Sequence, residues 1–123
     1  MSEIDDLTGE ALSEAVALAR GWKKSRDTQQ FSAWFWVDDA GVEQTAVAYY
    51  RPHSDIAKAW ELDGDGWLWK FVERGPYLMV GVTTGGSPRY TKYVGVDWAD
   101  SPTKAQAYAT ARCRAFLKAK AAE

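Results

Sequence analysis

The chain has 123 residues, a formal net charge of −2 and a single cysteine, Cys113. One cysteine excludes an intrachain disulfide and a thiolate metal cluster, and the nearly balanced charge argues against strong non-specific binding to nucleic acid. Residues 1–10 are acidic and do not resemble a signal peptide, and no stretch approaches the roughly 18 apolar residues that span a membrane, so we expect a cytoplasmic protein that does not bind membranes.

The first half of the chain predicts a helix followed by a hairpin. Residues 8–22 place alanine, leucine, valine and tryptophan at helical spacing, which makes one face apolar. A polar link, 23–30, separates this helix from the apolar strand 31–37, FSAWFWV. The turn sequence DDAG then leads into a returning strand over 42–50. We expect the two strands to pair as an antiparallel hairpin.

The second half predicts a short helix, a three-stranded meander and a long helix. In chain order these cover 54–62, 67–73, 77–84, 89–96 and 101–121. The short turns between the three strands predict antiparallel pairing. The whole order, α-β-β-α-β-β-β-α, predicts one α+β domain over 1–123, with a mainly antiparallel sheet of about five strands covered by helices.

The ends of the predicted helices carry recognisable signals. Thr8, Ser54 and Ser101 are placed to cap the three helices at their N-termini. Pro102 suits the first helical position, where its missing N–H costs nothing. Gly21 is a plausible terminator of the first helix, because glycine adopts positive φ without strain.

Tryptophan and phenylalanine alternate in the strand 67–73. Trp67, Trp69 and Phe71 point to one face of that strand, while the other face is also mostly apolar. We therefore expect both faces to be at least partly covered. The favoured interpretation is that the aromatic rings pack under helices in the core. The alternative is that some of them stack on a ligand such as a base or nucleotide.

A second aromatic pair, Trp34 and Trp36, shares one face of the strand 31–37. If this is the open face of an edge strand, the pair forms an exposed aromatic patch, which is typical of a binding surface. Several basic side chains on or beside the strands could meet phosphate. The candidate ligand-binding residues are Trp34, Trp36, Arg51, Trp67, Trp69, Lys70, Arg89 and Lys92.

The final helix, 101–121, carries many of the basic residues. Its basic residues cluster in the C-terminal half, where the negative end of the helix dipole favours cations. The uneven distribution of charge leaves a local basic patch open as one interpretation of these side chains. They are Lys104, Arg112, Arg114, Lys118 and Lys120.

Groups that move protons or hold metals are scarce. His53 is the only histidine, and it adjoins Ser54 and Asp55, but adjacency in sequence does not create a catalytic triad. We interpret 53–55 as the start of a helix, and Cys113 as a buried apolar residue. The loop beginning at Glu61 resembles a calcium loop but lacks its final acid, so we interpret it as a turn. We predict no catalytic residue, no metal ligand and no cofactor.

Three segments, 7–22, 50–62 and 100–119, together resemble the phage ABA-sandwich domain family, which comprises small phage and prophage proteins with no general assigned function. The resemblance implies a three-layer α/β/α arrangement, a phage or prophage origin and a bacterial cytoplasm. It transfers no catalytic residue. It depends on Ser54, Asp55, Ile56, Ala57 and Trp60 in the middle segment, and on Cys113, Arg114, Ala115 and Leu117-Lys118-Ala119 in the last.

A chain rich in flat rings and poor in catalysts predicts a binding protein that is not an enzyme. Stacking combined with phosphate pairing suits a sponge that sequesters a cyclic-nucleotide or ADP-ribose-type signal in anti-defence. The alternative is an inhibitor or adaptor that binds a bacterial host protein through an exposed aromatic patch. An enzyme ranks third. Assembly into a homo-oligomer is compatible with both binding functions.

Overall fold

The computed structural model describes residues 4, 7–27, 33–64, 66–75, 77–83, 91–97 and 103–121, and all structural statements concern these. The first half contains helix α1 (Gly9–Ala19), strands β1 (Lys23–Asp27), β2 (Ala33–Val37) and β3 (Glu43–Ala46), and the 3-10 turn η2 (Val47–Tyr49). The second half contains helix α2 (Ile56–Trp60), strands β4 (Leu68–Arg74), β5 (Tyr77–Thr83) and β6 (Thr91–Asp97), and helix α3 (Lys104–Ala121).

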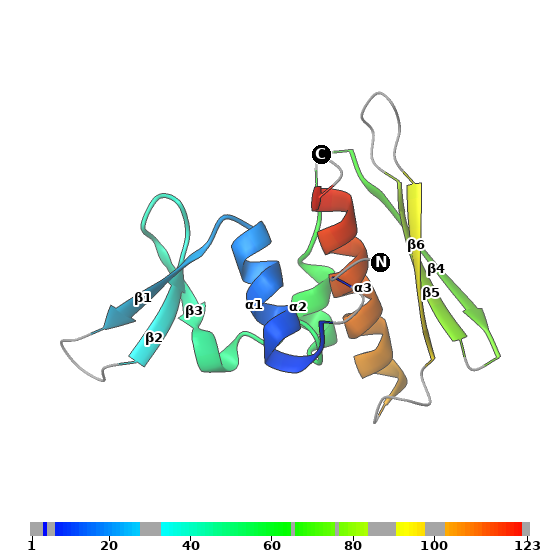
Figure 1. The fold of residues 1–123 in the computed structure, drawn as a ribbon, viewed down its shortest axis with the longest axis horizontal. Coiled ribbons are helices and arrows are strands. Elements are labelled where there is room, and N and C mark those ends of the chain that lie inside the picture. The colour runs from blue at the N-terminus through cyan, green and yellow to red at the C-terminus, as the bar shows by residue number, and fades with distance from the viewer. Residues whose placement is uncertain are drawn as a thin grey trace.

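The strands form two antiparallel sheets, β1-β2-β3 and β4-β5-β6, and not one. Figure 1 shows α1, α2 and α3 between the two sheets, with α1 toward the first and α3 against the second. The predicted α+β class is confirmed. The predicted single sheet of about five strands is wrong, and the α/β/α sandwich is not confirmed, because the helices lie inside and the sheets outside.

Strand β1 falls on the segment predicted as a polar link. It pairs with β2, with Lys24 opposite Trp36 and Arg26 opposite Trp34. Its sequence, KKSRD, has no apolar alternation, but an edge strand needs none where its side chains meet solvent, and charges there discourage pairing with other chains. Because β1 takes one edge and β3 the other, β2 is the central strand and not the edge strand considered above.

Helix α1 ends at the predicted glycine. Gly21 has φ of 83°, and its N–H donates to the Leu18 carbonyl at 3.0 Å. The N–H of Trp22 donates to the Ala17 carbonyl at 3.1 Å, which completes a Schellman C-cap. At the other end, Thr8 occupies the N-cap position as predicted, but its side chain makes no capping hydrogen bond.

Helix α2 is capped one residue later than predicted. Asp55, and not Ser54, is the N-cap, and its carboxylate accepts from the N–H groups of Ala57 and Lys58 at 3.0 and 3.4 Å. A carboxylate at this position also suits the positive end of the helix dipole. The cap thereby satisfies two backbone N–H groups in the first turn of α2.

Helix α3 is capped by Thr103 in the structure. Its hydroxyl accepts from the N–H of Gln106 at 3.1 Å, the usual geometry of a threonine N-cap. The predicted Ser101 cap and Pro102 lie outside the described residues.

Helix α3 is the centre of the core. It contacts β5 and β6 on one side and α1 and α2 on the other. Alanine side chains let these neighbours approach closely, and a helix buried nearly all round is typical of a domain core. Its fully buried small residues are Ala107, Ala109, Ala111, Cys113, Ala115 and Ala119.

Cys113 is buried, as predicted. Burial raises the pKa of its thiol to about 12. A thiol of that pKa stays protonated near neutral pH, so Cys113 acts in packing. Within the described part of the chain, no helix has both the length and the apolar character needed to cross a membrane.

Candidate ligand-binding site

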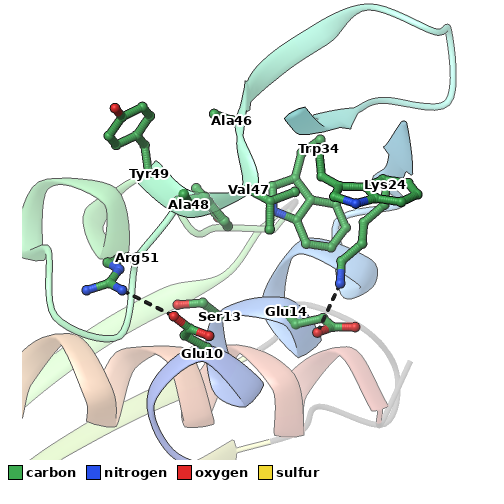
Figure 2. Close-up of a pocket in the computed structure, with 12 residues that line it drawn as sticks. Glu10, Ser13, Glu14, Lys24, Trp34, Ala46, Val47, Ala48, Tyr49 and Arg51 are labelled. Atoms are coloured by element: carbon green, nitrogen blue, oxygen red, sulfur yellow. Dashed lines mark hydrogen bonds and ion pairs between the residues drawn. The ribbon is translucent and has the colours of Figure 1, made fainter. Parts of the chain in front are cut away.

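A cavity of about 560 Å³ lies between α1 and the first sheet. Small-molecule sites usually measure roughly 300–1,000 Å³, so this volume suits a small organic ligand. Figure 2 shows the cavity with α1 below it and η2 above. It is lined by Glu10, Ser13, Glu14, Lys24, Trp34, Trp36, Ala46, Val47, Ala48, Tyr49, Tyr50 and Arg51.

Strand β2 supplies two tryptophans to the cavity at different depths. Trp36 is 1% exposed and forms part of the core, whereas Trp34 is 51% exposed. Alternation along a strand explains why both reach the same side. The predicted exposed pair is therefore corrected: Trp34 is exposed, but Trp36 is buried because β2 is the central strand and its face meets the core.

The opposite wall comes from the chain that leaves β3. The predicted strand 42–50 stops at Ala46, and the chain turns at η2. The side chains of Tyr49 and Tyr50 consequently differ in their exposure to solvent. Tyr49 is 79% exposed, while Tyr50 is buried. The hydroxyl of Tyr50 accepts from Arg20 Nη1 at 3.0 Å, and its ring lies 4.9 Å from that of Trp22. Burial raises the pKa of Tyr50, so this phenol is a neutral, fixed wall.

Two ion pairs cross the cavity from α1. Lys24 Nζ lies 3.3 Å from Glu14 Oε2, and Arg51 Nη2 lies 3.2 Å from Glu10 Oε1. Glu10 and Glu14 are one helical turn apart and therefore share a face of α1. Figure 2 shows the pairs at opposite ends of the cavity, with Ser13 between the two carboxylates.

Ser13 and His53 form a hydrogen bond at the side of α1 that faces the cavity. Ser13 Oγ lies 2.6 Å from His53 Nδ1. Burial, and to a lesser extent the charge of Arg51, lowers the pKa of His53. His53 is therefore neutral at pH 7, and its Nδ1 accepts from the serine hydroxyl in the tautomer that carries the proton on Nε2. The His53 carbonyl also accepts from Thr110 Oγ1 at 2.9 Å, so the turn after η2 is tied to both α1 and α3.

Comparison of the chain with protein-family models, with curated proteins and with solved structures finds no match. The function must therefore be argued from the geometry and chemistry of the site. Among the described residues, no group of three or more histidine, cysteine, aspartate or glutamate side chains is placed to hold a metal ion.

The structure brings three of the predicted site residues together, namely Trp34, Trp36 and Arg51. Lys70 is exposed on the outer face of β4, away from the cavity. Arg89 lies outside the described residues, and Lys92 is described only by its backbone, opposite Val82. Lys24, Tyr49 and the carboxylates of α1 were missed, because only the pairing of β1 and the turn at η2 bring them to the cavity.

Trp67 and Trp69 belong to the core. Trp67 is buried and its ring lies 5.8 Å from that of Phe116 on α3. Phe71, next on the same face, lies 5.5 Å from Tyr108. The interpretation that these rings pack under a helix is confirmed. The expectation that the other face of this strand, β4, is also partly covered is wrong at Leu68, which is 70% exposed.

The ring of Trp69 stacks against the guanidinium of Arg112 from α3. The guanidinium carbon lies 3.7 Å from the Trp69 ring centroid and 4.6 Å from that of Trp60. Nε and Nη2 donate to the carbonyls of Ala59 and Leu62 at 2.7 and 2.8 Å, at the negative end of α2. Burial lowers the pKa of Arg112 to about 10, so it stays charged at pH 7. Arg112 is buried and therefore does not contribute to the basic patch considered for this helix.

Proposed function

We propose that this chain is a non-enzymatic binding protein, and that the cavity between α1 and the first sheet holds a small ligand with a flat ring and an acidic group. The observation that carries the proposal is the arrangement of Trp34 at the rim with Lys24 and Arg51 at the two ends. Stacking of a base on an aromatic side chain contributes about 1–3 kcal/mol. Charge-assisted hydrogen bonds from arginine and lysine suit a phosphate.

The ligand class that fits this combination is a nucleotide, such as a cyclic nucleotide or ADP-ribose. Its role would be that of a signal that the protein sequesters in anti-defence. A phage or prophage origin and a bacterial cytoplasm are part of this proposal, and they rest on the resemblance of segments 7–22, 50–62 and 100–119 to phage ABA-sandwich proteins. A homo-oligomer is compatible with this role, because the rim of the cavity at Trp34 is exposed to solvent and therefore accessible to a second copy of the chain.

Binding without conversion is favoured by the shortage of groups that move protons. The sequence has one histidine and one cysteine. The thiol of Cys113, with its pKa of about 12, is buried in α3. The imidazole of His53 is hydrogen-bonded to Ser13, and the backbone of His53 is held by Thr110, whose hydroxyl donates to the His53 carbonyl. Conversion of a bound nucleotide in a way that depends on His53 would contradict this part of the proposal.

The test is isothermal titration calorimetry of the purified protein with cyclic AMP, cyclic di-AMP and ADP-ribose, followed by heat release and chromatography to show that the ligand is recovered intact. Trp34→Ala should weaken binding by roughly tenfold, from the loss of stacking. Arg51→Gln should weaken binding more than Trp34→Ala does, because it removes the charge that pairs with phosphate. Tyr77→Ala is the matched control, because this aromatic side chain is 52% exposed and lies outside the cavity. No saturable heat with any of the three nucleotides would overturn the proposal.

A second candidate function is supported by Tyr49 and Trp34, the two exposed aromatic side chains at the mouth of the cavity. Such rings often anchor protein–protein interfaces. An inhibitor or adaptor should capture one stoichiometric bacterial protein, and Trp34→Ala or Tyr49→Ala should abolish this capture while Tyr77→Ala does not. Capture that is unaffected by both variants would exclude this surface as the interface.

A further inference from the structure

The two cations of the cavity are both engaged by carboxylates of the protein itself. Lys24 comes from β1 and pairs with Glu14, and Arg51 comes from the chain after η2 and pairs with Glu10. The two acids belong to one face of one helix, whereas the cations come from separate elements. Each carboxylate therefore occupies a position in which an acidic group is held by a cation at one end of the cavity.

These pairs are easy to replace. All four side chains are accessible to solvent, with 39% and 51% exposure for Lys24 and Glu14, and 55% and 84% for Arg51 and Glu10. Ion pairs at that level of exposure contribute only about 0.2–1 kcal/mol. A carboxylate that leaves its cation can turn into solvent, so displacement requires no burial of an unpaired charge.

We infer that Glu10 and Glu14 occupy two anion-binding positions, and that the ligand carries two strongly acidic groups, such as two phosphates, joined through a part with a planar ring that reaches Trp34. This inference rests on the proposed function. Arg51 presents a planar fork that matches two oxygens of one phosphate, while Lys24 offers a single ammonium group near Trp36, with Nζ 5.7 Å from the ring centroid. A ligand with one acidic group can displace only one of the two carboxylates.

Substitution of Glu10 or Glu14 should change ligand binding in a direction that depends on the role of the carboxylate. If Glu10 and Glu14 compete with the ligand, their replacement by glutamine should tighten binding. If they instead contacted a cationic ligand held among the aromatic rings, or if they served only to hold α1 in place, the same replacements should weaken binding or leave it unchanged. The sign of the change therefore decides between these roles.

The experiment is a calorimetric titration with three probes that differ in phosphate number: adenosine, cyclic AMP and cyclic di-AMP. We expect the affinity to rise in that order. Glu10→Gln and Glu14→Gln should each tighten binding of cyclic di-AMP about two- to fivefold. Glu61→Gln is the matched control, because it removes the same charge from another exposed pair, in which Glu61 lies 3.8 Å from Lys58, outside this cavity. It should change the affinity by much less.

Several outcomes would overturn the inference while leaving the proposed function in place. These are equal affinity for cyclic AMP and cyclic di-AMP, unchanged or weaker binding in Glu10→Gln and Glu14→Gln, and an equal gain in Glu61→Gln, which would show an effect of net charge alone. If neither the wild-type protein nor either variant binds any probe, both the inference and the proposed function fail. Unfolding midpoints of the variants, which should match the wild type because the side chains are exposed, serve as the folding control.

Discussion

The guanidinium of Arg112 stacks on the ring of Trp69, with 3.7 Å between the guanidinium carbon and the ring centroid. Two of its nitrogens donate to carbonyls at the end of α2, and the third, Nη1, is buried with no hydrogen-bond partner among the described residues. One side chain of α3 thus joins α2 to β4. Trp69 is in turn held by its indole N–H, which donates to Asp63 at 3.1 Å.

Arg112→Ala should lower the free energy of unfolding by about 3 kcal/mol, because it leaves two backbone carbonyls without donors and exposes a gap beside Trp69. Arg112→Lys should recover only part of this loss, since an ammonium group cannot stack or reach both carbonyls in one plane. Urea denaturation measures both. Lys70→Ala, on the exposed face of β4, is the control and should stay within about 0.5 kcal/mol of the wild type. A comparable loss in Lys70→Ala, or none in Arg112→Ala, would contradict this role.

Most helices and strands of this fold could be predicted, because periodicity and caps are local signals. The alternation of Trp67, Trp69 and Phe71 predicted the buried face of β4 correctly. The split into two sheets could not be predicted, since strand pairing depends on contacts between distant segments. Arg112 illustrates the same difficulty, because among several basic residues of one helix nothing in the local pattern marks the one that turns inward to the carbonyls of α2.

The candidate site was predicted only in part, for a related reason. Trp34, Trp36 and Arg51 were proposed from their chemistry, and the structure places them around one cavity. Glu10 and Lys24 reach the same cavity only because β1 forms and the chain turns at η2. A polar edge strand has no hydrophobic pattern, so its pairing partner and the residues it delivers are not readable from the sequence.

Trp67 and Trp34 should respond differently to truncation. Trp67→Ala removes a buried ring packed on Phe116 and should lower the free energy of unfolding by about 3–5 kcal/mol. Trp34→Ala removes a half-exposed ring and should cost about 1 kcal/mol or less. Thermal and urea unfolding of both variants provide the comparison. Equal losses would mean that Trp34 is a core residue and would weaken its assignment to the ligand site.

The free energy of unfolding should depend on pH through His53. Its pKa in the fold is lowered from 6.5 by burial and by Arg51, against a small opposing effect of Glu10. As pH falls through about 6.5, the unfolded chain therefore binds a proton more readily than the fold, and stability decreases. His53→Gln keeps an acceptor for Ser13 without a titrating ring, and should reduce the loss of stability between about pH 7.5 and about pH 5.5. An identical pH dependence in both proteins would contradict the assignment.

Cys113 should be unreactive in the folded protein. Burial raises the pKa of its thiol to about 12, so very little thiolate exists at about pH 8, and the side chain is enclosed by α3 and its neighbours. Ellman's reagent should modify Cys113 completely in denaturant but only slowly in native buffer, at a rate that follows transient unfolding. Rapid modification of the native protein would show that the packing of α3 is looser than described.

Entry of a ligand between α1 and the first sheet should be visible in the indole N–H signals of the seven tryptophans. A ¹H–¹⁵N spectrum recorded during titration with cyclic di-AMP, with each signal assigned from single Trp→Phe variants, reports on every ring at once. We expect the signals of Trp34 and Trp36 to move and saturate together, while those of Trp67 and Trp69 stay in place. Movement confined to Trp67 and Trp69, or no movement at saturating nucleotide, would contradict this expectation.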